Sequence, residues 1–259
     1  MSIATAPLLA EAGTISPPRF GLLSVAQIVD TADQHWVDGV TYPLPPSPTA
    51  VIGAVDCNPD TLTLGNDIPW TSDSPVRVIA GVAVKKPGWD EGEISAHARG
   101  ALTAGEGPAL ETGLWPGFVN AADTPANNTA QSILTAIGVL EEWLYDTQPG
   151  AGVLHVARSA VGHLVRARQI REVNGQLQTP LGTLVSAGAY PGTGPAGVAA
   201  AAGTVWVAAT PAVRLRRTPI RVQESFNHRS NKAQVVADRI YVPSWDNASA
   251  AALVQLETV

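Results

Sequence analysis

Between Thr204 and Val259 the hydrophobic and polar residues alternate in short runs, and almost none of this stretch has a helical pattern. Such alternation places the apolar side chains on one face of a pleated strand. We expect strands at Thr204–Thr210, Val213–Arg216, Ile220–Val222, Lys232–Val242 and Ala251–Leu256, with Pro243 ending the fourth. No catalytic motif interrupts these strands. A sheet of such strands without catalytic residues indicates a protein that functions through contacts of its surface.

The middle of the chain changes to a helical pattern. The best helix is expected at Asn128–Tyr145, where four apolar residues form an i, i+4, i+7, i+11 stripe: Ile133, Ile137, Leu140 and Leu144. A short strand at Val153–Val156 precedes a second helix, which we expect to begin at Ser159, as its N-cap, and to end near Ile170. The Asn174-Gly175 pair that follows is a strong signal for a tight β-hairpin.

A strand and a third helix are expected before this region. Val76–Val84 is expected to form a strand, and Asp90 then caps a helix with acidic residues near its positive end. Glycine at positions 105 and 107 and Pro108 should break or kink that helix before it continues to Leu114.

Two segments lack a clear period. Residues 42–75 contain seven prolines, with only short apolar runs between them. A segment of this length with little regular structure is usually functional or a linker, although a meander inside the domain is the alternative. Residues 1–20 are rich in Ala, Thr and Pro and are expected to form either an extended arm or a simple mobile terminus.

Composition narrows the class of protein. The chain has 259 residues, of which 45% are hydrophobic and 15% charged, against about 25% charged in a typical globular domain. A low charged fraction suits a protein that hides surface in permanent contacts, and a large all-β domain with many turns is the alternative. The net charge of −6 argues against a direct nucleic-acid binder, since such proteins are usually basic. A single cysteine, Cys57, excludes an intramolecular disulfide, and no stretch is apolar enough to predict a signal peptide or a membrane span.

Candidate chemistry is weak. The match to G-x-G-x-x-G at 192–197 has neither a following helix nor an acidic residue about 20 positions later, so we expect a turn and no cofactor. No His/Cys spacing predicts a metal site. His155 and Ser159 are the residues that an enzyme would use, but no G-x-S-x-G elbow surrounds the serine. No catalytic residue is therefore expected.

The order of motifs from residue 130 to 259 resembles the major capsid proteins of tailed double-stranded DNA bacteriophages with the Hong Kong 97 capsid fold. The resemblance is based on these elements in sequence: Leu181-Gly182, Tyr190-Pro191-Gly192, Gly203-Thr204-Val205-Trp206, Val213 to Val222, Asn227 and Asn231, Ala237-Asp238-Arg239, and Pro243-Ser244-Trp245. Leu184 departs from the family, in which many members have proline at this point.

The resemblance implies an α+β fold of the Hong Kong 97 type. Residues 1–41 would form an N-terminal arm and lead-in, 42–75 an extended loop (the E-loop), and 76–127 a peripheral domain with a spine helix. Residues 128–212 would form an axial domain, and 213–259 the return strands of the peripheral domain.

The function implied is self-assembly into hexamers and pentamers of an icosahedral shell around phage double-stranded DNA, without sequence-specific DNA contact. The subunit would be assembled in the bacterial host cytoplasm and located in the virion, with no membrane contact. Portal, scaffold, protease or decoration proteins are further partners that the family allows. An encapsulin-like compartment shell is the alternative, and an enzyme is the alternative from another class.

Eight residues are expected at contacts between subunits. Trp36 and Trp70 lie beside loop signals, and tryptophan is enriched at interfaces, although core filling is the plain alternative. Arg166 and Arg168 give the second helix a basic end that could pair with a neighbour's carboxylates or simply complement the helix dipole. Arg214 and Arg216 are expected to pair between subunits, with packaged DNA as the alternative. Asn174 and Gly175 would lie near a five-fold or six-fold axis.

Overall fold

The structure is a computed structural model, and it describes residues 18–32, 35–44, 69–85, 90–147, 151–227, 229 and 231–256. The predicted N-terminal arm, up to residue 17, and the predicted loop from 45 to 68 lie outside these residues. The described helices are α1 (Leu22–Val25), α2 (Glu91–Val119), α3 (Ile133–Thr147) and α4 (Val161–Arg166), with short 3₁₀ turns η1 (His35–Asp38), η2 (Arg158–Ala160) and η3 (Pro195–Gly197).

Three sheets organise the described strands. The first holds β1 (Gln27–Asp30), β10 (Arg214–Arg217), β12 (Lys232–Ser244), β11 (Arg221–Asn227) and β4 (Val76–Lys85). The second has the order β13 (Ala250–Gln255), β9 (Thr204–Thr210), β5 (Val153–Ala157), β8 (Leu184–Gly188), β7 (Gln176–Gln178) and β6 (Arg171–Val173). The third is a ladder of β2 (Val40–Pro43) and β3 (Trp70–Asp73).

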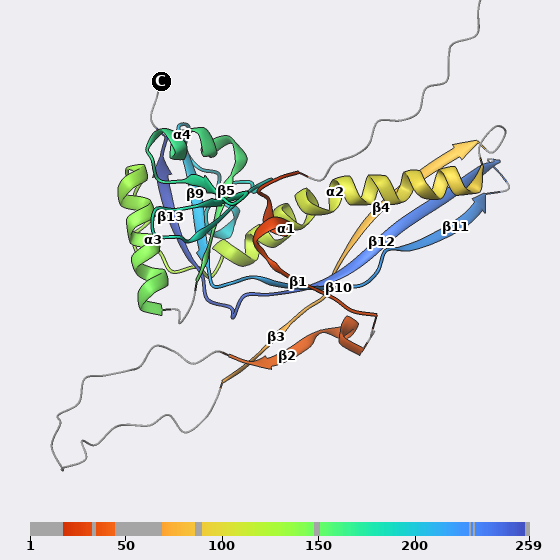
Figure 1. Ribbon diagram of the computed structural model, residues 1–259, viewed down its shortest axis with the longest axis horizontal. Coiled ribbons are helices and arrows are strands. Elements are labelled where there is room, and N and C mark those ends of the chain that lie inside the picture. Colours follow the sequence, from red (N-terminus) through yellow and green to blue (C-terminus); the bar gives the residue numbers. More distant parts are fainter. Residues whose placement is uncertain are drawn as a thin grey trace, which may run out of the picture.

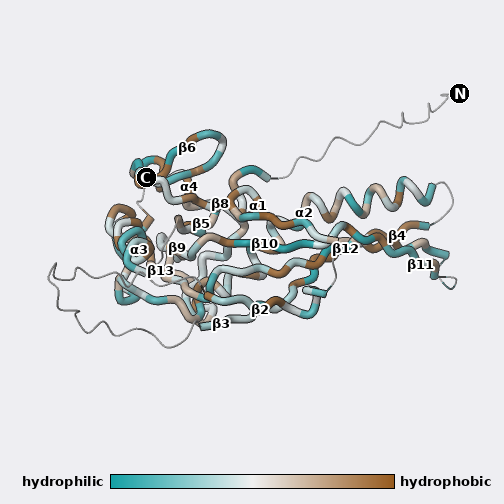
Figure 2. Tube along the Cα trace, turned by 60° about the horizontal axis from the view of Figure 1, so that its bottom comes forward, coloured by the Kyte–Doolittle hydropathy of each residue, from teal (hydrophilic) through white to brown (hydrophobic). Residues whose placement is uncertain are grey.

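The long helix α2 lies along one face of the five-stranded sheet, and α3 and α4 lie with the six-stranded sheet at the other end of the molecule (Figure 1). In the turned view, the β2–β3 ladder lies on the side of β10 and β12 that is opposite α2 (Figure 2). One apolar core lies between the six-stranded sheet and α3 and α4, and a second core lies between α2 and both larger sheets. The C-terminal end of α2 therefore joins the two halves.

Alternation in β12 accounts for the two faces of the five-stranded sheet. Val235 and Ala237 pack in the core beneath α2, while Gln234 and Val236 lie on the opposite face. The strands predicted between Thr204 and Leu256 are all present, with β9 matching its predicted bounds. The predicted stop at Pro243 is wrong, because β12 continues to Ser244. Its pairing with β4 ends at Tyr241, so Pro243 lies where only β10 pairs with β12 and a missing N–H is tolerated.

The prediction was a break or a kink at Gly105, Gly107 and Pro108, and the break is wrong, because α2 runs without interruption through these residues. Leu102 and Leu110 are buried on either side of this segment, so packing on the sheet outweighs the lost helical hydrogen bond. Its start is as predicted: the Asp90 carboxylate accepts from the backbone N–H of Gly92, and Glu93 accepts from the N–H of Asp90, which is a capping box.

The second predicted helix is shorter than expected. Ser159 lies inside η2 and makes no cap hydrogen bond, so its assignment as an N-cap is wrong. The helix α4 ends at Arg166, because the backbone N–H groups of Arg168 and Gln169 turn back to the carbonyls of Val165 and Leu164, both at 2.9 Å. This pair of bonds is the Schellman motif that closes a helix.

Candidate functional site

The eight residues predicted at subunit contacts fall into two groups. Arg166, Arg168, Asn174 and Gly175 belong to the unit built on the six-stranded sheet. The other group lies around the five-stranded sheet and the β2–β3 ladder: Arg214, Arg216, Trp36 and Trp70. Their role between copies stays a prediction.

The Asn174-Gly175 turn has the geometry that the sequence predicts. The two residues have φ of 52° and 79°, and they connect β6 and β7 with Val173 opposite Gln176. Positive φ at both central positions is the type I′ hairpin turn. Both residues are exposed, so the tip is available for a contact.

The arginines of β10 and β11 have partners within the same chain. Arg217 Nε lies 2.6 Å from Asp30 Oδ1, and Arg221 Nη2 lies 2.7 Å from Asp238 Oδ2. Arg214 Nε donates to Gln27 Oε1 at 3.0 Å. Arg214, which is predicted to pair between subunits, therefore has a polar partner in its own chain, and its role between copies stays a prediction.

Asp238 holds the outer face of the five-stranded sheet together. Its side chain is fully buried between Arg77 of β4 and Arg221 of β11, and both arginines donate to Oδ2. Burial by itself would raise the pKa of Asp238, but the hydrogen bonds from Arg221 and Arg77 hold it below its usual value. On the opposite face, Arg239 Nη1 lies 2.9 Å from Glu106 Oε2, which also accepts from the Tyr241 hydroxyl at 2.8 Å.

A buried carboxylate on α2 connects three segments. Glu111 accepts from the N–H of Leu22 at 2.8 Å and from the N–H of Ala189 at 2.6 Å. Gly21 and Gly188 leave the space for this carboxylate, since a methyl group at either position would collide with it. Sequence reasoning missed this junction. The available signal was a pair of glutamates on α2, at 106 and 111, within a helix stripe that is otherwise apolar.

His155 belongs to a closed polar network. Its Nε2 lies 2.8 Å from Thr210 Oγ1, its Nδ1 lies 3.1 Å from the Tyr190 hydroxyl, and Ser186 Oγ lies 2.7 Å from the same hydroxyl. The imidazole stacks on Phe118 of α2 at 4.2 Å. Burial lowers the pKa of His155 to about 3, so the ring is neutral. The ring is fully buried and both of its nitrogens have partners, which is the arrangement of a structural histidine.

The base of the β2–β3 ladder is polar and partly buried. Burial and the neighbouring Asp73 raise the pKa of Tyr42, and burial also raises the pKa of Asp73. Trp36 is half-buried in η1, while Trp70 is 64% exposed at the start of β3. An exposed indole of this size fits the predicted contact role.

The described residues contain no group of three His, Cys, Asp or Glu side chains that could hold a metal ion. In the same part of the chain, no helix is long and apolar enough to cross a membrane.

Comparison with known proteins gives a match by structure alone. No family model and no curated protein matches the sequence. The capsid of a native GTA particle superimposes with a TM-score of 0.56 at 11% identity, covering 98% of this chain and 96% of the other. The SrpI encapsulin of Synechococcus elongatus gives 0.55 at 12% identity, covering 99% and 94%. The mature capsid of bacteriophage PhiM1 gives 0.55 at 11% identity, covering 100% and 93%. The predicted Hong Kong 97 capsid fold is confirmed, with α2 as its spine helix.

Proposed function

Starting from this fold, we propose that the chain is the subunit of a closed icosahedral shell, and specifically the major capsid protein of a double-stranded DNA bacteriophage. One observation carries the proposal: the structures of two capsids and an encapsulin match nearly the whole chain, and more than nine-tenths of each of them is covered. The subunits would form hexamers and pentamers. No catalytic role is part of the proposal.

A second copy of the chain is the main partner in this proposal. The five proposed segments, from N-terminal arm to return strands, would each contact neighbours or support those that do. Packaged DNA would be held without sequence-specific contacts, which fits the net charge of −6. Portal, scaffold, protease or decoration proteins remain further proposed partners.

Electron microscopy of the purified full-length protein, before and after nuclease treatment, tests the proposal. Closed shells that contain nuclease-protected DNA support a phage capsid. Closed shells that co-purify with one enzyme, and with no DNA, would instead support an encapsulin-like compartment. A small soluble oligomer at every protein concentration and ionic strength would refute both.

The proposed E-loop has a defined root. The backbone N–H of Leu44 donates to the carbonyl of Pro69 at 2.8 Å, next to the last pair of the β2–β3 ladder. Because these ends are already close together, residues 45–68 can be replaced by a short Gly-rich turn without pulling the ladder apart. We predict that this variant folds as a subunit or capsomer and forms no closed shell.

Circular dichroism and sedimentation check this prediction together. A matched variant with residues 45–68 replaced by a Gly/Ser segment of the same length separates loss of reach from loss of side chains. Normal particles from the short variant would contradict an E-loop role for this segment.

A further inference from the structure

A cavity of about 410 Å³ opens on the outer side of α3. Its walls include Ile137 and Tyr145 of α3, Gln169 just after α4, and Leu181 in the turn between β7 and β8. Tyr145 is 85% exposed and Leu181 is 79% exposed. The rim of the cavity is therefore largely apolar. Exposing these side chains to water is unfavourable, so covering them would stabilise the subunit.

Two carboxylates line this cavity, that of the exposed Glu142 and that of the half-buried Glu141. The Oε2 of Glu141 accepts from Thr183 Oγ1 at 2.6 Å. Its Oε1 is buried and, within the described residues, has no hydrogen-bond partner. The nearby amide of Gln169 donates from Nε2 to the carbonyl of Ala167. A buried carboxylate oxygen without a donor is unfavourable, so a positively charged donor is the natural occupant.

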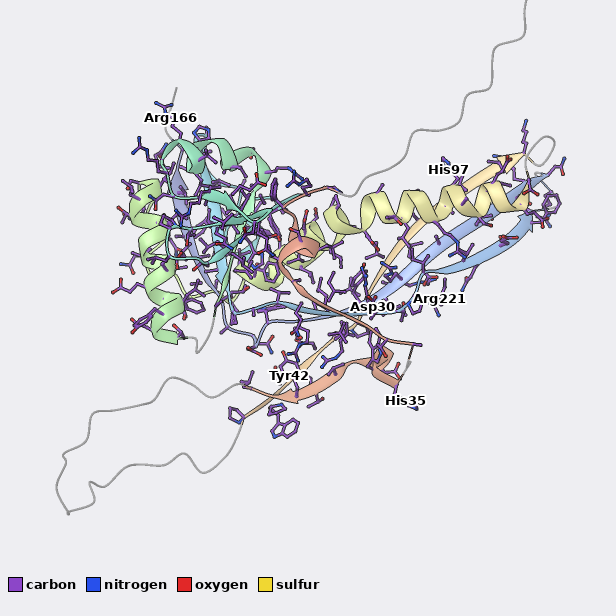
Figure 3. All side chains as sticks on the ribbon, in the orientation of Figure 1. Asp30, His35, Tyr42, His97, Arg166 and Arg221 are labelled. Atoms are coloured by element: carbon purple, nitrogen blue, oxygen red, sulfur yellow. The ribbon has the colours of Figure 1, made fainter. Side chains whose placement is uncertain are left out.

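The end of α4 presents the complementary groups. Arg166 and Arg168 are both exposed, and neither makes an ion pair with another described residue. Arg166 extends from α4 away from the rest of the molecule (Figure 3). Arg168 has φ of 58° at the position after the helix where glycine is the usual residue. An arginine therefore occupies this position although its backbone conformation favours glycine.

We propose that, in the assembled shell, the arginine-bearing end of α4 in a neighbouring copy fills the α3 cavity and pairs with Glu141. This inference rests on the proposed function and identifies the partner surfaces within a capsomer. A ring contact is heterologous, so each copy offers its cavity to one neighbour and its arginines to the other. An arginine suits the cavity because its apolar stem covers the rim while its guanidinium reaches the carboxylate.

Charge reversal and rescue test the pairing in the full-length chain. The variants are Glu141→Lys, the double variant Arg166→Glu with Arg168→Glu, and the combination of all three. The control is Arg99→Glu with Arg229→Glu, which changes the same charge at exposed positions outside this unit. The measurement is the lowest protein concentration that gives particles, by sedimentation and negative-stain microscopy. Melting of the dissociated subunits by circular dichroism reports folding, and Glu141→Gln gives a neutral variant of nearly the same shape.

We expect Glu141→Lys and the double arginine variant each to raise that concentration roughly tenfold or more, as coupling of close interfacial charge pairs implies. The combination of all three substitutions should restore that concentration to near the wild-type value. The Arg99/Arg229 control should assemble at near the wild-type concentration, and adding Glu141→Lys to it should give no rescue. Wild-type assembly in the single-surface variants, or loss without rescue in folded subunits, would overturn the pairing while leaving the proposed shell function intact. A wild-type chain that forms no particle overturns the proposed function and this contact with it.

Discussion

The buried network around His155 predicts how the stability of the subunit depends on pH. The Thr210 hydroxyl donates to the carbonyl of Pro211 at 2.9 Å, so it accepts from Nε2–H of His155. Nδ1 must then accept from the Tyr190 hydroxyl, which in turn accepts from Ser186. The network is complete with a neutral imidazole. A second ring proton would oppose the Tyr190 donor inside a core that excludes water.

The expected loss of stability follows from the two pKa values. In the unfolded chain His155 has an ordinary pKa of 6.5, and in the folded subunit its pKa is about 3. Below pH 6.5 the unfolded state binds a proton that the folded state does not, so this contribution is full above pH 6.5 and is lost as the pH falls toward 3. At about 1.4 kcal/mol per pH unit, the loss is about 1 kcal/mol at pH 5.5 and about 3 kcal/mol at pH 4.5.

Urea unfolding of dissociated subunits between pH 7.5 and 4.5 measures this effect. His155→Gln keeps a donor toward Thr210 and does not titrate in this pH range. Because it loses the stacking of the imidazole on Phe118, it should be less stable than the wild type at pH 7.5. That difference should shrink by about 3 kcal/mol at pH 4.5. His97→Gln, at an exposed position on α2, should track the wild type. A wild-type advantage over His155→Gln that stays constant across this range would refute a neutral, buried His155.

Three further substitutions test other parts of the fold. Leu140→Ala removes a fully buried side chain from the α3 stripe, and it should lower the unfolding free energy of the subunit by about 2–5 kcal/mol. Urea titration measures this loss, and an unchanged midpoint would contradict the place of Leu140 in the core. Glu111→Ala removes the acceptor of the buried N–H of Leu22 and of the part-buried N–H of Ala189, and should cost about 1–3 kcal/mol by the same assay. Glu142→Ala at an exposed position should change little. Gly175→Val forces a β-branched residue to φ of 79° and should lower the unfolding free energy of the subunit by about 1–3 kcal/mol. Sedimentation should show a larger loss of capsomers than of folded subunits. Equal losses would argue against a contact at the hairpin tip.

The strands and the hairpin could be predicted because their signals are local. Alternation with period two gave the strands after Thr204, and Asn174-Gly175 specified a type I′ turn that needs nothing from the rest of the chain. The end of α4 and the continuity of α2 could not be predicted in the same way. Packing of Leu102 and Leu110 on a distant sheet decides whether the helix continues through Pro108, and that packing has no signature nearby in the sequence.

The polar contacts were harder still, because their partners are far apart along the chain. Arg77 and Asp238 are separated by 161 residues, and Glu106 and Arg239 by 133. Charge patterning suggested that the arginines near β10 need carboxylates, but it could not distinguish a carboxylate in the same chain from one in a neighbour. The cavity beside Glu141 was also invisible from sequence, since it depends on α3, the end of α4 and the turn at Leu181 meeting at one place.

The positions of these polar contacts explain why α2 can join the two halves in one arrangement. Apolar packing between a helix and a sheet tolerates small shifts along the helix, because many methyl groups can replace one another. The Glu111 carboxylate cannot shift in this way, since its two oxygens accept from Leu22 and Ala189, which belong to different segments. About two turns further along α2, Phe118 stacks on His155 of the six-stranded sheet. A helix fixed at both points has a single position relative to that sheet, and in the proposed shell this fixes the angle at which each subunit presents its α3 cavity and the end of α4 to its neighbours.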